Sequence, residues 1–328
     1  MKRYMKVLSL LGIPLMIILS IVIYGIQRYG PNFNLYLFPP SAQKYGDIAL
    51  ERLDMLGLYA QGEKWDKTRQ ETHKALKKAK SYKEAQQILQ KAVSVAGGKH
   101  SSLVSKNSFQ KSLVDQQKPV AQVEGGILYL KVPAIEGLAP KTLTAYANKL
   151  NTPLTKNYKG AIVDLRGNTG GNMTPMLIGL SGLLPDGDLF SFEDKYRNKQ
   201  VVELQGKELV NQDSIALDKP VVKQDIPVAV LIDHQTASSG EMTAFAFQGL
   251  ENTLFFGEPT AGYTTGNNVI PLYDGALLVI TSSRIINRQG QVYENNPIFP
   301  DRNSQDPLAD AKQWLSDCLL YTSDAADE

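Results

Sequence analysis

Two short segments rich in serine and glycine carry the side chains best suited to chemistry. Residues 236–241 read Thr-Ala-Ser-Ser-Gly-Glu and follow an apolar run, 228–232. A serine placed where a buried strand gives way to a helix is exposed, and the helix start offers unpaired N–H groups and the positive end of its dipole. An attacking hydroxyl and its oxyanion need both. Ser238 is therefore the predicted nucleophile, although Ser238 and Glu241 also match a capping box that simply starts a helix.

The second segment, 164–172, reads Asp-Leu-Arg-Gly-Asn-Thr-Gly-Gly-Asn and again follows a short apolar run. Its glycines would let backbone N–H groups approach a substrate atom without an intervening side chain. The alternatives are a tight strand-to-helix turn and a phosphate cradle. No Gly-Lys-Ser/Thr follows, which disfavours a nucleoside-triphosphate loop.

The elements that must position these segments alternate between strands and helices from residue 120 onward. Short apolar runs separated by helical patterns predict an α/β domain with mostly parallel, buried strands. The predicted strands are 127–132, 161–165, 228–232, 254–256 and 276–281, and the predicted helices are 142–150, 173–184, 241–250 and 307–315. The polar stretch 190–224 is expected to form a hairpin or a lid.

The preceding stretch, 42–97, repeats apolar residues at three- and four-residue steps and predicts a bundle of about three helices. Ser81 and Glu84 form a capping-box start for the last helix, and Gly97-Gly98 provide its stop. The net charge is only +2 and the lysines are scattered, so no nucleic-acid partner is expected. A single cysteine, Cys318, leaves no internal disulfide and no cysteine cluster for zinc.

The two ends of the chain carry their own signals. Three basic residues lie within residues 1–6, and the apolar run 7–26 that follows has about the length of a membrane-crossing helix. This predicts a cytoplasmic tip, an uncleaved transmembrane anchor, a linker over 27–41 and an extracytoplasmic body; a cleaved signal peptide is the alternative. Residues 316–328 follow no pattern in the chain and resemble translated sequencing adapter, which predicts a non-native tail.

The segments described so far occur in a specific order with three others. These are 99–102 (Lys-His-Ser-Ser), 257–260 (Gly-Glu-Pro-Thr) and 294–301 (Glu-Asn-Asn-Pro-Ile-Phe-Pro-Asp). From about residue 45 to residue 315, the ordered set closely resembles the carboxy-terminal-processing and tricorn-like serine peptidase family. The resemblance implies a crotonase-like spiral core over 98–315 and a bacterial enzyme that cleaves peptide or protein substrates and needs no cofactor or metal; attachment to the membrane is predicted by the N-terminal apolar run instead. Too little chain lies between His100 and residue 127 for the PDZ domain that processing proteases often insert.

The resemblance offers two ways to activate the serine. In the processing branch a lysine base follows the Gly-Glu-Pro-Thr segment, but the matching residue here is Tyr263 and residues 224–311 contain no lysine. The tricorn-like branch uses a histidine base oriented by a glutamate, and His100 and Glu294 stand at those positions. An ordinary imidazole would make activity fall as the pH drops through about 6–7.

Other roles also follow from the resemblance. That branch carries a bridging serine before its histidine, where this chain has Lys99; Ser101 is the candidate bridge instead. The oxyanion hole is expected to use the N–H of Ser239 and one from the pair Gly170 and Gly171. His234 is a rival base or a substrate contact. The alternatives to a peptidase are an inactive relative that binds peptides or lipids, and an esterase for small substrates.

Overall fold

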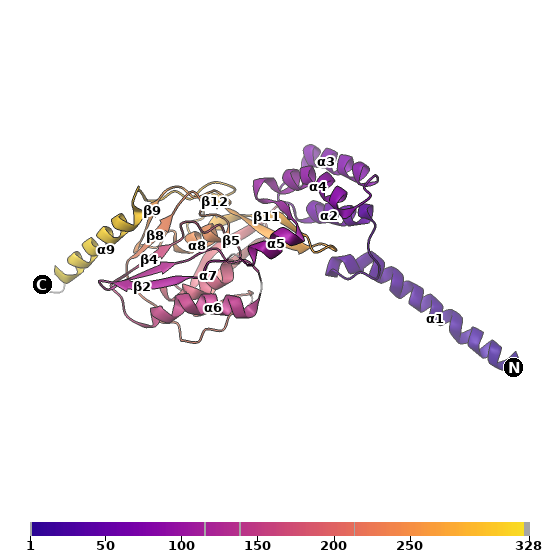
Figure 1. Ribbon diagram of the computed structural model, residues 1–328, viewed down its shortest axis with the longest axis horizontal. Helices are drawn as coiled ribbons and strands as arrows, with labels where there is room; N and C mark the ends of the chain where they lie inside the picture. The colour runs from indigo at the N-terminus through magenta and orange to yellow at the C-terminus, as the bar shows by residue number, and fades with distance from the viewer. Residues whose placement is uncertain (1, 115, 138, 213, 325–328) are drawn as a thin grey trace. The chain divides into compact units, whose positions relative to one another are not determined.

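The computed structural model describes the backbone of residues 2–324 except 115, 138 and 213, and the side chains of residues 14–318 except those three and residue 32. The chain divides into two compact units (Figure 1). The first contains Met1–Phe109 and Asn268–Ile280, and the second contains Gln110–Asn267 and Thr281–Glu328. The positions of the parts relative to one another are not determined.

The first unit begins with helix α1 (Lys2–Tyr29) and the short 3-10 helix η1 (Gly30–Phe33). The predicted linker 27–41 is therefore helical at its start. Pro31 fits into η1 because the N–H that proline lacks has no hydrogen-bond partner in the first turn of a helix. In the part of the chain that the structure describes, no helix is both long and apolar enough to cross a membrane. The predicted anchor 7–26 includes residues 7–13, whose side chains lie outside the described part.

The predicted bundle is confirmed as α2 (Ala42–Leu56), α3 (Gly62–Leu76) and α4 (Tyr82–Gly97). Ser81 Oγ accepts the N–H of Glu84 at 3.2 Å, as the capping signal predicted. The helices bury a shared core in which Trp65, Leu53, Leu76 and Leu89 are almost completely inaccessible to solvent. The unit also contains β1 (Ser102–Val104), which pairs antiparallel with the first half of β11 (Leu277–Asn287).

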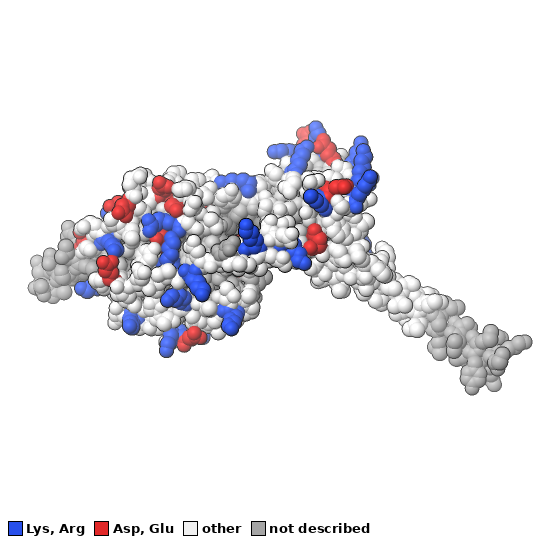
Figure 2. Space-filling view, in the orientation of Figure 1, with Lys and Arg blue, Asp and Glu red and all other residues white. Residues whose placement is uncertain are grey.

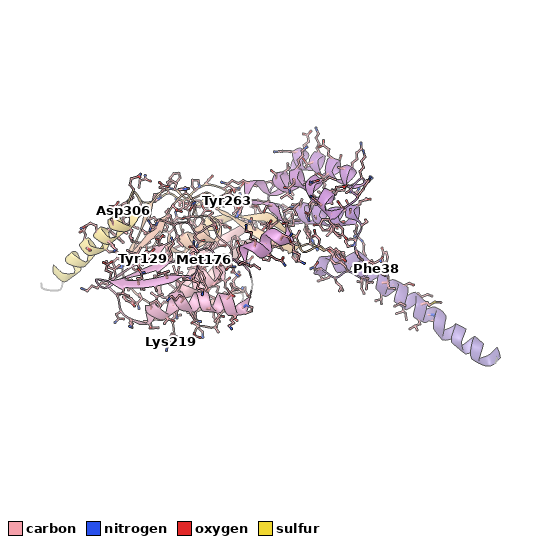
Figure 3. The ribbon with its side chains drawn as sticks, viewed as in Figure 1. Phe38, Tyr129, Met176, Lys219, Tyr263 and Asp306 are labelled. Atoms are coloured by element: carbon pink, nitrogen blue, oxygen red, sulfur yellow. The ribbon has the colours of Figure 1, made fainter. Side chains whose placement is uncertain are left out.

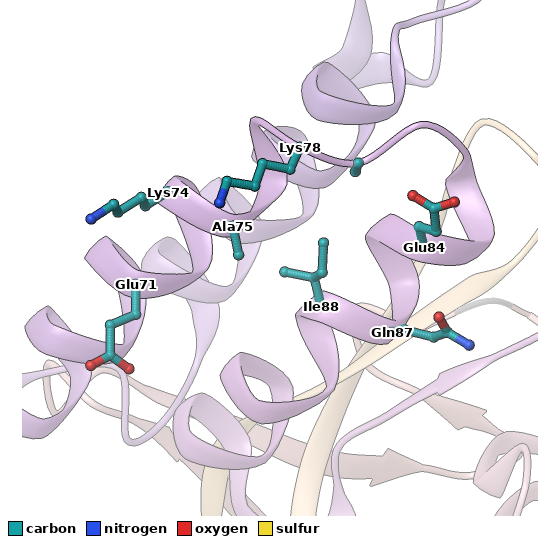
Figure 4. Close-up of a pocket in the computed structure, with 8 residues that line it drawn as sticks. Glu71, Lys74, Ala75, Lys78, Glu84, Gln87 and Ile88 are labelled. Carbon is teal, nitrogen blue, oxygen red and sulfur yellow. The ribbon is translucent and has the colours of Figure 1, made fainter.

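A shallow hollow of about 690 Å³ lies between α3 and α4 (Figure 4). Its floor includes Ala75 and Ile88, and Lys74 and Lys78 stand at its rim. None of the predicted site residues lines it, and it belongs wholly to the first unit. In the face shown in Figure 2, basic side chains are scattered among acidic ones rather than gathered in one stripe.

The second unit is built on a sheet in the order β13-β9-β8-β4-β3-β2. All neighbours are parallel except the edge pair β2 and β3. The strands are β2 (Val120–Glu124), β3 (Ile127–Lys131), β4 (Gly160–Asp164), β8 (Val228–Ile232), β9 (Thr253–Gly257) and β13 (Arg302–Asn303). The predicted α/β architecture and its parallel strands are thereby confirmed; the crotonase-like spiral arrangement stays a prediction.

Helices cover both faces of this sheet because alternate strand residues point to opposite sides. One face packs with α6 (Pro140–Asn151), α7 (Met173–Gly179) and α8 (Ser239–Phe247). On the other face Ile162, Leu231 and Phe256 pack against Leu315 of α9 (Pro307–Asp324). Helix α9 thus continues into the predicted tail, of which residues 325–328 lie outside the described part.

The polar stretch after α7 forms a hairpin, which was one of the two predicted forms. Strands β5 (Gly187–Asp194) and β6 (Lys199–Gln205) pair antiparallel, and β5 also pairs with the second half of β11. The short strand β7 (Glu208–Leu209) extends it. Helix α7 is shorter than predicted: it ends at Gly179 and is followed by a 3-10 turn over Ser181–Leu183.

Candidate active site

The two segments singled out by sequence lie next to each other at one edge of the sheet. Strands β4 and β8 are parallel neighbours, with Asp164 paired to Leu231, so the loops that leave their carboxyl ends meet. The loops are also bonded directly. The N–H of Ala237 donates to the carbonyl of Asn168 at 2.9 Å, and Thr236 Oγ1 donates to the carbonyl of Leu165 at 3.0 Å.

Ser238 occupies a strained backbone conformation at the start of α8. It is the N-cap residue, and its N–H donates to Glu241 Oε2 at 2.9 Å, so the capping-box prediction is confirmed. An ordinary N-cap is extended, whereas Ser238 has φ 51° and ψ −120°. For a residue with a Cβ, such a conformation costs on the order of 1–3 kcal/mol and is typical of functional sites. A sharp, strained strand-to-helix turn is also how other hydrolases expose a serine nucleophile.

Gly170 lies directly against this serine. A Cβ built on Gly170 would stand 2.7 Å from the Cβ of Ser238 and 3.1 Å from the nitrogen of Ser239. The backbone of Gly170 also has φ 111°, in the region that favours glycine. The glycine loop after β4 therefore lies directly against Ser238, the predicted nucleophile, and the predicted approach of its N–H groups to a substrate atom stays a prediction.

The structure distinguishes between the two predicted glycine amides. The N–H of Gly170 donates to Asn168 Oδ1 at 2.9 Å, so it is already engaged. Within the described residues, the N–H groups of Gly171 and Ser239 have no acceptor. Ser239 Oγ donates to the carbonyl of Gly171 at 2.6 Å and fixes the two residues together. The predicted oxyanion donors that are not already engaged are therefore Gly171 and Ser239, and their role stays a prediction.

Asn168 is a structural residue of this site that sequence reasoning did not single out. It is fully buried; its Nδ2 donates to the carbonyl of Val132 at 2.9 Å, and its Oδ1 accepts the Gly170 N–H. Its carbonyl accepts the Ala237 N–H, so one residue connects loops from three strands.

Replacing Asn168 with alanine should lower the free energy of unfolding by about 2–3 kcal/mol, because it leaves buried groups of Val132 and Gly170 without partners. Urea denaturation measures this, with Asn252→Ala as the control, since Asn252 is exposed and its side chain donates a long hydrogen bond, 3.4 Å, to Asp225. Equal losses in the two variants would contradict the structural role of Asn168.

Asp164 is a second residue whose importance the sequence did not reveal. Its buried carboxylate accepts from Tyr129 at 2.7 Å, from Lys131 at 3.1 Å and twice from the Arg166 guanidinium. Burial acts to raise the pKa of Asp164, but hydrogen bonds and positive charge from Arg166 and Lys131 leave it lowered. Apolar residues on both sides of Asp164 concealed this ion cluster in the sequence.

Glu241 was predicted only as a helix-capping partner, yet it makes more contacts than a cap requires. Its buried carboxylate accepts from Ser238 and from three donors in the loop after β9: the Thr260 hydroxyl and the N–H groups of Gly262 and Tyr263. Tyr263, which the resemblance matches to the lysine position of the processing branch, thereby shares an acceptor oxygen with Ser238, the predicted nucleophile. The capping pattern alone could not have revealed these long-range bonds.

His100 and Ser101 belong to the first unit and Ser238 belongs to the second, so the predicted pairing of base and nucleophile stays a prediction. His100 ends a short 3-10 turn, Gly98–His100. Burial, followed by the positive charge of Lys99, lowers the pKa of His100 to about 4. The imidazole is therefore neutral at physiological pH, which is the form that a general base requires.

Glu294 and His234 are both engaged with other residues of the second unit. A carboxylate oxygen of Glu294 lies 3.7 Å from the Arg284 guanidinium, and its predicted role as orienter of His100 stays a prediction. His234 is largely exposed, and its Nδ1 lies 3.0 Å from Glu258 Oε2, a hydrogen bond that raises the pKa of His234. No group of three or more histidine, cysteine or acidic side chains among the described residues is placed to hold a metal ion.

The family model of peptidase family S41 matches residues 126–304, which include both loops and the strands that carry them. The chain belongs to peptidase family S41. This membership makes it a serine peptidase, and its known relatives include carboxy-terminal processing proteases. One of these, CtpA of Bacillus subtilis (strain 168), is 30% identical over 154 residues, which are 46% of this chain and 30% of that protein.

Two similarities cover most of the S41 chain. The nisin-resistance protein of Lactococcus lactis subsp. lactis is 43% identical over 295 residues, which are 88% of this chain and 92% of that protein. The structure of a lipoprotein from Streptococcus agalactiae has a TM-score of 0.78 and 40% identity, covering 86% of this chain and 99% of that one. A photosystem II D1 C-terminal processing protease, at TM-score 0.57 and 15% identity, shares the fold.

Proposed function

We propose that this protein cleaves peptide bonds by acyl transfer, with Ser238 as nucleophile, His100 as general base and Glu294 as the residue that orients His100. The observation that carries the proposal is the strained turn at Ser238, flanked by the N–H groups of Gly171 and Ser239. The serine would attack the carbonyl carbon while His100 takes its proton. The two N–H groups would stabilise the oxyanion, and His100 would return the proton to the leaving amine. Water would then hydrolyse the acyl-enzyme.

Because the proposed base is a histidine, the proposed mechanism is that of the tricorn-like branch of the family. Tyr263 shares the Glu241 Oε2 acceptor with Ser238, and so occupies the neighbourhood in which the processing branch carries its lysine. A phenol is a poor base at neutral pH because its pKa is near 10. A histidine with a lowered pKa is available for the role.

Nisin is the proposed substrate to test first. The support is the nisin-resistance protein of Lactococcus lactis, which is similar over nearly its whole length. We further propose that the enzyme works outside the cytoplasm, attached to the membrane through its N-terminal segment; the relative described as a lipoprotein supports this. Protease added to cells stripped of their wall should then degrade the protein, and complete protection would contradict the location.

Labelling with a fluorophosphonate tests the nucleophile. The wild-type protein is expected to react once per chain, and peptide mapping should locate the adduct on Ser238. Ser238→Ala should not react, and its far-UV circular dichroism spectrum should match that of the wild type, which shows that the fold is retained. A folded wild-type protein that does not react would support the alternative of an inactive binding protein.

Mass spectrometry of nisin incubated with the protein tests the substrate. Wild-type protein should produce two fragments, whose masses together equal nisin plus one water, and Ser238→Ala should produce none. If the protein hydrolyses a p-nitrophenyl ester but leaves nisin and unrelated peptides intact, the esterase alternative replaces the peptidase proposal. If protein that reacts with the fluorophosphonate binds nisin without cleaving it, nisin is not the substrate. The proposal that Ser238 is the nucleophile would still stand.

A further inference from the structure

The buried carboxylate of Glu241 lies at the centre of the active-site turn. Glu241 is in the first turn of α8 and is completely inaccessible to solvent. Its Oε1 accepts from the Thr260 hydroxyl and from the N–H of Gly262 at 2.8 Å. Its Oε2 accepts from the N–H of Tyr263 at 2.8 Å and from the N–H of Ser238 at 2.9 Å. Figure 3 labels Tyr263, the last residue of the loop that these bonds hold.

This arrangement exceeds what a helix start requires. In a capping box the N3 carboxylate satisfies the N-cap N–H and otherwise faces solvent. Here the carboxylate is removed from water, and burial raises the pKa of Glu241 despite the four donors. Removing a carboxylate from water is costly, and an exposed glutamate or a neutral side chain could cap the helix without that cost. The buried position of Glu241 therefore needs a reason beyond capping.

We propose that Glu241 is a positioning residue that holds Ser238 in its strained conformation and fixes the loop Thr260–Tyr263 beside it. The Ser238 N–H points to an oxygen that the Tyr263 N–H also binds, so the backbone of the nucleophile is tied to a second loop as well as to its own helix. Without this acceptor, the hydrogen bonds from the N–H groups of Ser238 and Tyr263 are lost, and the strained turn is expected to relax toward the extended conformation of an ordinary N-cap. The inference rests on the proposed role of Ser238 as nucleophile.

The kinetic consequence is a loss in kcat rather than in KM, because Glu241 itself does not contact substrate. Glu241→Ala should lower kcat about 100-fold, the effect of displacing a reacting atom by about 1 Å. Glu241→Gln keeps one acceptor oxygen and should retain more activity than Glu241→Ala. Glu251→Gln is the matched control, because Glu251 is an exposed glutamate of the same unit that no part of the site contacts. A rise in KM with kcat unchanged would overturn the proposal.

A second measurement does not depend on catalysis. Glycine tolerates the conformation of residue 238 and alanine does not, so Ser238→Gly should melt about 2–4 °C above Ser238→Ala when Glu241 is present. In the Glu241→Ala background the turn is free to relax, so Ser238→Gly and Ser238→Ala should have the same melting temperature. An equal difference in both backgrounds would overturn the positioning role. If the difference behaves as expected but wild-type protein fails to react with the fluorophosphonate, the proposed function fails and the positioning of residue 238 stands.

Discussion

Replacing Gly170 with alanine is expected to reduce kcat at least 100-fold and to lower the free energy of unfolding by about 2–4 kcal/mol. The new methyl group would meet the Cβ of Ser238 at 2.7 Å and the nitrogen of Ser239 at 3.1 Å. Neither neighbour can yield by rotating a side chain, so the turn that presents the nucleophile must shift. The positive φ of Gly170 adds backbone strain for any residue with a Cβ.

The same loop provides a control in Gly167. It also has a positive φ, 69°, but the nearest heavy atom to its Cβ would be Gln235 Oε1 at 3.6 Å. Gly167→Ala should therefore lower stability by about 1 kcal/mol and leave kcat within a factor of two or three. Steady-state kinetics and urea denaturation of the two variants test the difference. Equal activities would argue against Ser238, which Gly170 adjoins, as the reacting serine.

The pH dependence of activity should differ from that of an ordinary histidine enzyme. A general base works only when neutral, and burial with the neighbouring Lys99 lowers the pKa of His100 from 6.5 to about 4. Activity should therefore persist at pH 5 and be lost only as the pH falls through about 4, not through the 6–7 expected from sequence. Since the unfolded histidine binds its proton more tightly than the folded one, stability should also decline as the pH drops from 6.5 toward 4.

Two variants, His100→Ala and Lys99→Gln, and one control variant, Lys78→Gln, test this expectation by measuring kcat/KM as a function of pH. His100→Ala should lower kcat about 1000-fold, as loss of a general base does. Lys99→Gln removes a positive charge beside the imidazole and should move the acidic limb to higher pH, whereas Lys78→Gln, on the distant turn after α3, should leave it in place. If kcat/KM of the wild type falls near pH 6.5, or if the pH at which it falls is the same in Lys99→Gln, the result would argue against His100 as the base.

The elements of this fold could be predicted because each is marked by local sequence. The strand 228–232 is apolar throughout and buried on both faces, and α4 begins after its cap Ser81 and stops before its cap Gly98, as the sequence indicates. The membrane anchor is the element on which sequence and structure disagree: an apolar run predicted it, and no helix of the described residues qualifies as a span.

The contacts that organise the site could not be predicted because they join residues far apart in the chain. Glu241 and Tyr263 are 22 residues apart and Asn168 and Val132 are 36 apart, and neither pair carries a periodic signal. The lowered pKa of His100 likewise depends on burial, which sequence does not report. The sequence thus indicated the strand-to-helix turn at Ser238 and the glycine loop beside it, but not the groups that hold them; the role of Ser238 as nucleophile stays a prediction.

The bonds of Asn168 bear on how this scaffold could be redesigned. Its side chain and carbonyl join the segments that follow β3, β4 and β8, so these three segments form one cooperative piece. A chimera that receives a single loop from a homologue would lose hydrogen bonds of Asn168 and leave a buried amide group without a partner. Exchange of specificity between relatives should therefore succeed only when all three segments are transplanted together.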